Sequence, residues 1–315
     1  MTTKADGVGH SRGSAAEWVT HRERGSVTLL RIMTFVSLRL GRRAGRVILY
    51  LIAAYFYTFA PTARRHALTY LRRALGREPT AADRFRHVLT FATTIHDRVY
   101  VVNEQFDKFE ITVSGNEFIR AAIAEGNGAF LMGAHVGSFE IIRGVGRREP
   151  DVRVAMAMYE DNARKVNDQL AAINPAAKAD VIALGHLDAM LKIREYLDRG
   201  TFVGVLGDRT LGEEPALTVD FLGAPARIPI GPMRAAALLR RRVFFMIGLF
   251  RGGNRYHIAF EPLADFTHLE ASQRDAATAA AVQRYATLLE KYCRSDPYNW
   301  FNFYDFWRGA AHVDR

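Results

Sequence analysis

Residues 129–140 read AFLMGAHVGSFE, and the fold predicted for the rest of the chain follows from this stretch. Its apolar start, Ala129 to Gly133, has the length and composition of a buried strand. A helix is expected from about Ser138, because serine is a favoured N-cap residue. His135 then lies in the turn between strand and helix, and Glu140 lies in the first helical turn.

The same alternation continues on both sides of this stretch. Short apolar runs bounded by turn residues predict strands, and the longer segments between them predict helices. The expected strands cover 109–113, 129–133, 152–158, 180–184 and 202–206, and the expected helices cover 116–124, 138–145, 162–173 and 187–197. This order predicts an α/β fold with a largely parallel central sheet flanked by helices.

A hairpin and a last helix are expected toward the C-terminus. Segments 243–250 and 256–260 flank Gly252-Gly253-Asn254, and they predict an antiparallel hairpin at one edge of the sheet. The last helix is expected over 272–292.

Four helices are expected before the first strand. They cover Ser26 to about Gly41, 46–60, 62–76 and 81–101. Pro61 ends the second of them, and Thr80 with Asp83 forms a capping pair at the start of the fourth.

Positive charge is concentrated in the first quarter of the chain. Residues 1–77 contain 14 Lys and Arg against 3 Asp and Glu, a net charge of +11, whereas the whole 315-residue chain carries +10. The same quarter holds the apolar runs 27–40 and 47–60. The second run is shorter than the roughly 20 residues that a membrane-spanning helix needs. It therefore predicts a helix lying in the membrane interface, with a buried pair of core helices as the alternative.

These features predict three regions. They are a polar N-terminus at 1–25, a basic, apolar, helical membrane-associating segment at 26–77, and an α/β domain at 78–315 that shares one core with the preceding helices. Residues 1–24 lack the apolar stretch of a secretory signal, which favours the cytoplasmic side of a membrane. Nucleic-acid binding is disfavoured, because the basic residues alternate with apolar segments instead of forming a hydrophilic stripe.

Metal and redox chemistry is not predicted. The single cysteine, Cys293, excludes an intramolecular disulfide and a metal site built from several thiolates. No other group of residues has metal-ligand spacing. The sequence therefore predicts neither a metal nor a cofactor.

His135 and Glu140 are the candidate catalytic residues. Ligands of parallel sheets bind beyond the carboxyl ends of the strands, where His135 is expected. A carboxylate in the first helical turn is favoured by the helix dipole. It could hold one imidazole nitrogen protonated and leave the other free as a base. Ser138 lacks a Gly-x-Ser-x-Gly elbow, so His135 is expected to act directly on an acceptor. The alternative is a capping serine beside an ordinary surface histidine and glutamate.

Three short blocks stand out along the chain. The first is His135-VGSF-Glu140. The second is Gly207-Asp208-Arg209, and the third is FLGAPA at 221–226 followed by PIGP at 229–232. In content and order the blocks resemble the lysophospholipid acyltransferase superfamily, and within it the lipid A late (lauroyl and myristoyl) acyltransferases, whose signature is histidine, four residues and an acid. The resemblance covers about 18–307.

The resemblance implies a bacterial acyltransferase at the cytoplasmic face of the inner membrane. It would move a fatty acyl chain from an acyl carrier protein or coenzyme A thioester to a hydroxyl or amine of a lipid or glycolipid. His135 would be the general base and Glu140 its orienting acid. Arg209 would bind acceptor phosphate or the oxyanion, positioned by Asp208. The alternative for Asp208 and Arg209 is a structural salt bridge.

The tail departs from the family pattern. Residues 300–307 read WFNFYDFW, with Asn and Asp where lipid A acyltransferases commonly carry Arg or His. This resembles a sister branch associated with polyene or glycolipid biosynthesis, so the acceptor is left open. The tail is expected either to cover an acyl groove or to pack as ordinary core.

Other functions stay open at the level of sequence. An acyl hydrolase or thioesterase would use water as the acceptor, and a noncatalytic lipid-binding protein would not need His135. The arginines at 147–148 and 240–242 predict either solvated faces or a docking site for an acidic carrier or for the phosphates of coenzyme A.

Overall fold

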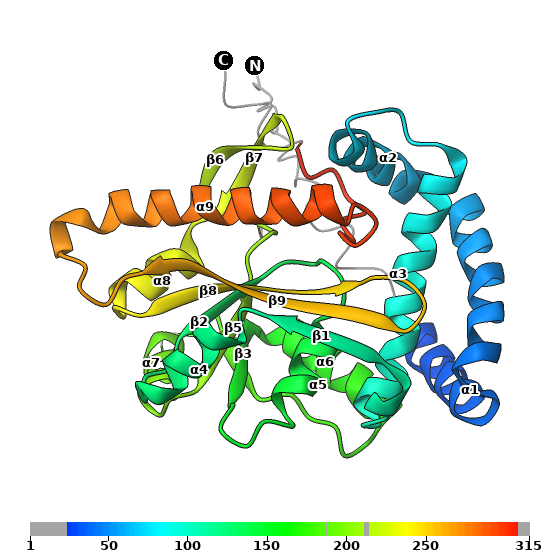
Figure 1. Ribbon diagram of the computed structural model, residues 1–315, viewed down its shortest axis with the longest axis horizontal. Helices are drawn as coiled ribbons and strands as arrows, with labels where there is room; N and C mark the ends of the chain where they lie inside the picture. Colours follow the sequence, from blue (N-terminus) through cyan, green and yellow to red (C-terminus); the bar gives the residue numbers. More distant parts are fainter. Residues whose placement is uncertain (1–23, 187, 211–213, 308–315) are drawn as a thin grey trace, which may run out of the picture.

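The computed structural model describes residues 24–186, 188–210 and 214–307. A central sheet carries strands in the order β1-β9-β8-β2-β5-β3-β4. Helix α9 (Arg274–Ser295) lies along one face, and α4, α5 and α6 lie against the other (Figure 1). This arrangement confirms the predicted α/β fold with a mostly parallel sheet.

The strands and helices of the sheet region lie close to the predicted segments. The strands are β1 (Glu110–Ser114), β2 (Phe130–Gly133), β3 (Val154–Tyr159), β4 (Val181–Leu184), β5 (Phe202–Leu206), β8 (Arg242–Phe250) and β9 (Arg255–Asp265). The helices are α4 (Asn116–Ala124), α5 (Phe139–Gly146), α6 (Glu160–Ile173), α7 (Ala189–Asp198) and α8 (Gly231–Leu238).

The β8–β9 hairpin differs from the prediction in its position. Its two strands are antiparallel, as expected. The hairpin does not form the edge, because β1 pairs in parallel with β9 on its outer side. The sequence could not show that a strand from an earlier segment would return to cover β9.

A small second sheet was not predicted. It consists of β6 (Ala216–Phe221) and β7 (Ala224–Pro229), which are antiparallel. Leu222 and Gly223 form the turn with φ angles of 53° and 73°. Positive φ at both central positions is typical of a tight hairpin turn. Gly223 was therefore the residue in the sequence that could have indicated this hairpin.

The N-terminal helices pack beside the sheet. They are α1 (Arg24–Phe59), α2 (Pro61–Leu75) and α3 (Ala81–Val102). The two helices predicted on either side of Gly41 form one element, kinked where Gly41 has φ 79° and ψ 168°. The capping pair is confirmed: the Thr80 hydroxyl accepts from Asp83 N at 3.1 Å, and the Asp83 carboxylate accepts from Thr80 N at 2.8 Å.

Helix α1 presents apolar side chains to its surroundings. Leu51 is 71% exposed and Phe59 is 69% exposed, whereas Leu49 and Ala53 are buried. The other exposed apolar residues of α1 are Ile32, Phe35, Leu38, Leu40, Val47, Ile48, Tyr50, Tyr55 and Phe56. Burial of both segments as core helices therefore does not describe α1.

A single membrane-crossing helix is not found in the part of the chain that the structure describes. Leu30–Phe59 and Pro61–Leu75, joined at a 95° bend, together have sufficient length and apolar character.

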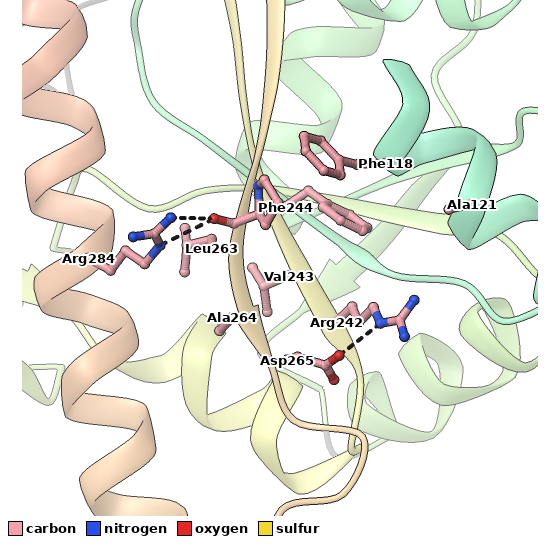
Figure 2. A pocket seen from close by; sticks show the side chains of 10 residues that line it. Phe118, Ala121, Arg242, Val243, Phe244, Leu263, Ala264, Asp265 and Arg284 are labelled. Atoms are coloured by element: carbon pink, nitrogen blue, oxygen red, sulfur yellow. Dashed lines mark hydrogen bonds and ion pairs between the residues drawn. The ribbon is translucent and has the colours of Figure 1, made fainter. Parts of the chain in front are cut away.

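Two cavities lie near the start of β8. The larger, of about 370 Å³, lies between α4, β8, β9 and α9 and has Phe118, Phe244 and Leu263 in its lining (Figure 2). The smaller cavity, of about 230 Å³, is lined in part by the arginines at 240–242.

The arginines beside these cavities are largely compensated. Arg241 pairs with Asp198, and Arg242 pairs with Glu125 at 2.6 Å and Asp265 at 2.9 Å. The Arg241 side chain is only 15% exposed, so a solvated face does not describe the whole triplet, and carrier docking stays a prediction.

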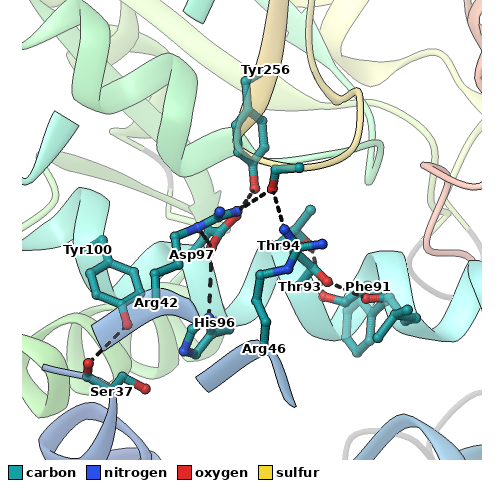
Figure 3. A network of polar contacts seen from close by, with 12 residues as sticks. Ser37, Arg42, Arg46, Phe91, Thr93, Thr94, His96, Asp97, Tyr100 and Tyr256 are labelled. Atoms are coloured by element: carbon teal, nitrogen blue, oxygen red, sulfur yellow. Dashed lines mark hydrogen bonds and ion pairs between the residues drawn. The ribbon is translucent and has the colours of Figure 1, made fainter. Parts of the chain in front are cut away.

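A buried carboxylate joins the N-terminal helices to the sheet. Asp97 of α3 accepts hydrogen bonds from Arg42 Nε and Nη2, both at 2.7 Å, and from the Tyr256 hydroxyl at 2.8 Å (Figure 3). Arg42 and Arg46 also donate to the carbonyl of Gly253 in the β8–β9 turn. The network ties α1, α3 and β9 together.

The charge of Asp97 is stabilised by these partners. Burial raises the pKa of this carboxyl, but the nearby His96 ring and the hydrogen bonds from Arg42 and Tyr256 outweigh burial and leave the pKa below its ordinary value. Arg42 is 12% exposed, so neither partner can be hydrated easily if the other is lost.

Asp97→Ala is expected to lower the free energy of unfolding by about 3–5 kcal/mol, because the guanidinium of Arg42 loses its buried counter-charge. Denaturant titration of the purified protein measures the change. Asp188→Ala is the control: Asp188 pairs with Lys192 at 2.7 Å but is 51% exposed, and such pairs contribute little. Equal shifts of the two unfolding midpoints would contradict the proposed importance of the network.

Candidate active site

The register of two parallel strands brings His135 and Asp208 together. Strands β2 and β5 are paired so that Gly133 lies opposite Leu206. Gly207 N donates to Gly133 O at 2.9 Å, which continues the pairing past the last strand residues. His135 and Asp208 each follow two residues after this matched pair, so they lie side by side at the carboxyl end of the sheet.

The two side chains are hydrogen-bonded. His135 Nδ1 lies 2.8 Å from Asp208 Oδ1, and the backbone N–H of His135 donates to Oδ2 at 3.0 Å. An ionised carboxylate only accepts hydrogen bonds, so Nδ1 carries the proton and Nε2 keeps its lone pair. The His135 side chain is 31% exposed, whereas that of Asp208 is fully buried.

Asp208 is held in its charged form. Burial raises the pKa of this carboxyl, but the electrostatic attraction and hydrogen bond of His135 outweigh burial, with further contributions from Arg209 and Trp300. The net result is a pKa well below the ordinary value. A buried, ionised carboxylate can stabilise an imidazolium when His135 takes up a proton.

A glycine shapes the turn between β2 and α5. Gly137 has φ 64°, and a Cβ there would lie 2.0 Å from the carbonyl oxygen of Gly248. Ser138 N donates to the same carbonyl at 2.7 Å. The Ser138 hydroxyl accepts from Ile141 N at 3.4 Å as the N-cap of α5. The turn thus holds the start of α5 against β8 immediately after His135.

Glu140 does not make the contact that the sequence predicted. It is buried and accepts from Arg143 Nε at 2.9 Å, and Arg98 Nε lies 3.9 Å away. The expected hydrogen bond to His135 is made by Asp208. Glu140 pairs with Arg143, three residues along α5, whereas Asp208 reaches the imidazole from the neighbouring strand. The catalytic role of Glu140 stays a prediction.

The predicted role of Asp208 in positioning Arg209 stays a prediction. Its carboxylate binds His135, and the guanidinium of Arg209 lies over the Tyr304 ring at 5.4 Å from the centroid. Among the described residues, the buried Nε of Arg209 has no hydrogen-bond partner. The guanidinium therefore keeps an unused donor beside the candidate site.

The C-terminal segment crosses the site, and its contacts with His135 and Asp208 were not predicted from the sequence. Phe301 N donates to His135 O and Gly137 N donates to Asn299 O, each at 2.8 Å. Trp300 is fully buried, and its indole Nε1 donates to Asp208 Oδ2 at 3.0 Å. Packing of this tail in the core is confirmed at Trp300, and a role as a cover for an acyl groove stays a prediction.

His87 of α3 binds the backbone of this segment at Trp300. Its ring is fully buried, and its Nε2 lies 2.8 Å from the carbonyl oxygen of Trp300. A carbonyl only accepts, so Nε2 carries the proton. Burial lowers the pKa of His87 to about 4, and the hydrogen bond to Trp300 opposes this only in part.

Within the described residues, no group of three or more His, Cys, Asp or Glu side chains could hold a metal ion. The chemistry available at the site is that of an imidazole base with a buried carboxylate partner and a nearby guanidinium.

The chain was compared with known protein families and with curated proteins. Residues 17–309 match the family described as bacterial lipid A biosynthesis acyltransferase. The comparison with curated proteins gave no match.

Stability is expected to fall as the pH drops from about 6.5 to about 4, because the unfolded chain protonates His87 and the folded protein does not. The loss attributable to this residue is about 3 kcal/mol. His87→Gln keeps a donor for the Trp300 carbonyl. In unfolding curves recorded at several pH values, this variant should lose less of its free energy of unfolding between about pH 6.5 and 4 than the parent protein. His268 is exposed, so His268→Gln serves as control. If the free energy of unfolding of His87→Gln fell with pH as steeply as that of the control, the assignment would be contradicted.

Proposed function

This chain belongs to the bacterial lipid A biosynthesis acyltransferase family, and from that premise we propose that His135 is the general base of a fatty acyl transfer oriented by Asp208. The family makes the protein an acyltransferase. The observation that carries the proposal is the hydrogen bond of 2.8 Å from His135 Nδ1 to a fully buried carboxylate. That bond leaves Nε2 free to take a proton.

The proposed reaction begins with proton transfer to His135. Nε2 removes the proton from an acceptor hydroxyl or amine, and the acceptor atom attacks the thioester carbonyl carbon. The tetrahedral oxyanion is stabilised by backbone N–H groups at the start of α5 or by Arg209. The carbon–sulfur bond then breaks, and the leaving thiolate takes the proton from the imidazolium. The products are the acylated acceptor and the free thiol.

Asp208 takes the orienting role in this proposal. It holds the tautomer in which Nε2 is unprotonated, and its charge stabilises the imidazolium formed during the reaction. Glu140 is bound to Arg143, which supports a role in stabilising the first turn of α5. Arg209 is proposed as the ligand of the acceptor phosphate or of the oxyanion, because it follows Asp208 directly beyond the carboxyl end of β5.

Donor and acceptor are proposed by class. The family implies a lipid acceptor and an acyl donor, and we infer an acyl carrier protein or coenzyme A thioester as donor and a lipid or glycolipid as acceptor. An acyl hydrolase remains the second candidate, because His135 is 31% exposed and water can reach it.

The membrane surface is proposed as the place of the reaction. The exposed apolar side chains of α1 lie on the same helix as the exposed Arg31, Arg39 and Arg43. Apolar residues that enter the acyl boundary, with arginines at the head groups, support binding to an anionic bilayer. The cytoplasmic face of the inner membrane is proposed as the side of the reaction, as the resemblance implies.

The experiment that tests the function uses radiolabelled acyl carrier protein thioester and a total lipid extract, with mass spectrometry of the product. Label in a lipid supports acyl transfer and identifies the acceptor. Label released only as fatty acid supports the hydrolase. No consumption of either the carrier protein thioester or acyl coenzyme A would contradict both.

His135→Ala is expected to reduce kcat by about 10²–10⁴-fold while the protein stays folded, because the base is lost. Asp208→Asn should cause a large loss through the wrong tautomer, and Glu140→Gln a smaller one. Steady-state kinetics with matched circular dichroism spectra measure the series. A noncatalytic lipid-binding protein predicts no change in any variant, and a larger loss in Glu140→Gln than in Asp208→Asn would return the orienting role to Glu140.

Leu51→Gln with Phe59→Gln is expected to weaken binding to phosphatidylglycerol vesicles by roughly tenfold or more, because two large side chains no longer enter the bilayer. Vesicle flotation measures binding. Leu191→Gln with Leu238→Gln is the matched control, since these leucines of α7 and α8 are 68% and 55% exposed. An equal loss of binding in both pairs would show that α1 is not the membrane-binding surface.

A further inference from the structure

We propose that Trp300 is a positioning residue for the general base, because its indole N–H fixes the carboxylate that holds His135. The inference rests on the proposed function and extends it to a residue of the C-terminal segment. Trp300 does not touch the reacting atoms in this proposal, and it acts through Asp208.

The hydrogen bonds of Asp208 show why its carboxylate needs a donor that does not belong to His135. Oδ1 accepts from His135 Nδ1 at 2.8 Å. Oδ2 accepts from His135 N at 3.0 Å and from Trp300 Nε1 at 3.0 Å. Two of these donors belong to His135, the residue to be positioned. Trp300 is therefore the side-chain donor that fixes the carboxylate independently of the base.

Trp300 is itself held firmly enough to serve this purpose. It is fully buried, and its ring packs edge-to-face against Tyr70 at 4.8 Å, Phe306 at 4.9 Å and Phe221 at 5.3 Å between centroids. Its carbonyl accepts from His87 Nε2 at 2.8 Å. The indole is thus enclosed by rings from α2, β6 and the tail itself.

The residues on either side of Trp300 fix the segment to the sheet. The Asn299 side chain accepts from Phe250 N at 2.8 Å and donates to Phe250 O at 3.1 Å, at the end of β8. Phe301 N donates to the carbonyl of His135. The same segment that supplies the indole therefore also fixes the backbone of the base, so small displacements of it move both partners of the pair.

Trp307 offers a matched comparison within the same aromatic cluster. Its indole Nε1 donates to the carbonyl oxygen of Phe221 at 3.3 Å, and its ring lies 6.1 Å from that of Trp300. It contacts two of the same rings, since it is stacked on Phe221 and packs edge-to-face against Phe306. Its N–H donates to a backbone carbonyl and not to Asp208, so the two tryptophans separate positioning from packing.

The kinetic test compares Trp300→Phe with Trp307→Phe. Trp300→Phe is expected to lower kcat by about 10- to 100-fold, the loss typical of a missing hydrogen bond to a charged group, with KM nearly unchanged. Trp307→Phe should keep kcat within about twofold of the parent. Equal kcat losses in the two variants, or a loss confined to KM, would overturn the proposal.

A double-mutant cycle tests whether Trp300 acts through Asp208. In an Asp208→Asn background, Trp300→Phe should cause little further loss of kcat, because the carboxylate that it positions is already gone. Losses that multiply independently would show that Trp300 acts by another route and would overturn the proposal.

A second measurement keeps the test valid if Trp300→Phe fails to fold. Benzothienylalanine, introduced at position 300 through a reassigned codon, keeps the shape of the indole and replaces its N–H by sulfur. The Nδ1–H proton of His135 is followed by NMR in the histidine-labelled protein and assigned through its loss in His135→Ala. We expect this signal to shift or broaden with the analogue at 300 and to stay unchanged with the analogue at 307. An unchanged signal at 300 would overturn the proposal.

The NMR readout also separates this inference from the proposed function. It reports the hydrogen bond between His135 and Asp208 without any turnover. A protein with no transferase activity but a signal sensitive to position 300 would contradict the function and leave the positioning intact.

Discussion

The parallel pairing of β2 with β5 is the constraint on which the site depends. With Gly133 opposite Leu206, the residues two places further on meet at the same edge of the sheet. A shift of one residue would separate the imidazole of His135 from the carboxylate of Asp208 and would exchange the side chains on the two faces of the strand. The site is therefore specified by the same register that packs β2 against β5.

Two buried carboxylates organise the molecule in similar ways. Asp97 accepts hydrogen bonds from Arg42 and Tyr256 and joins the N-terminal helices to the sheet. Asp208 accepts from His135 and Trp300 and joins the C-terminal segment to the site. A buried charge is tolerated only where donors surround it, so each carboxylate requires distant parts of the chain to be in place.

Local patterns in the sequence predicted most elements but not the partner of the base. Apolar runs such as 202–206 and caps such as Thr80 with Asp83 depend on neighbouring residues, and they were located correctly. The choice of Glu140 followed a short spacing along one helix. Asp208 is 73 residues from His135, and only strand register, which a single sequence does not reveal, brings the two together. The same reason hid the role of Trp300.

The place of Trp300 in the chain has a consequence for synthesis on the ribosome. A nascent chain made only as far as α9 already contains α1, the helix proposed to bind the bilayer. It lacks the indole that completes the surroundings of Asp208 and the backbone contact that holds His135. Under the proposed function, attachment to the bilayer can therefore precede completion of the His135–Asp208 pair.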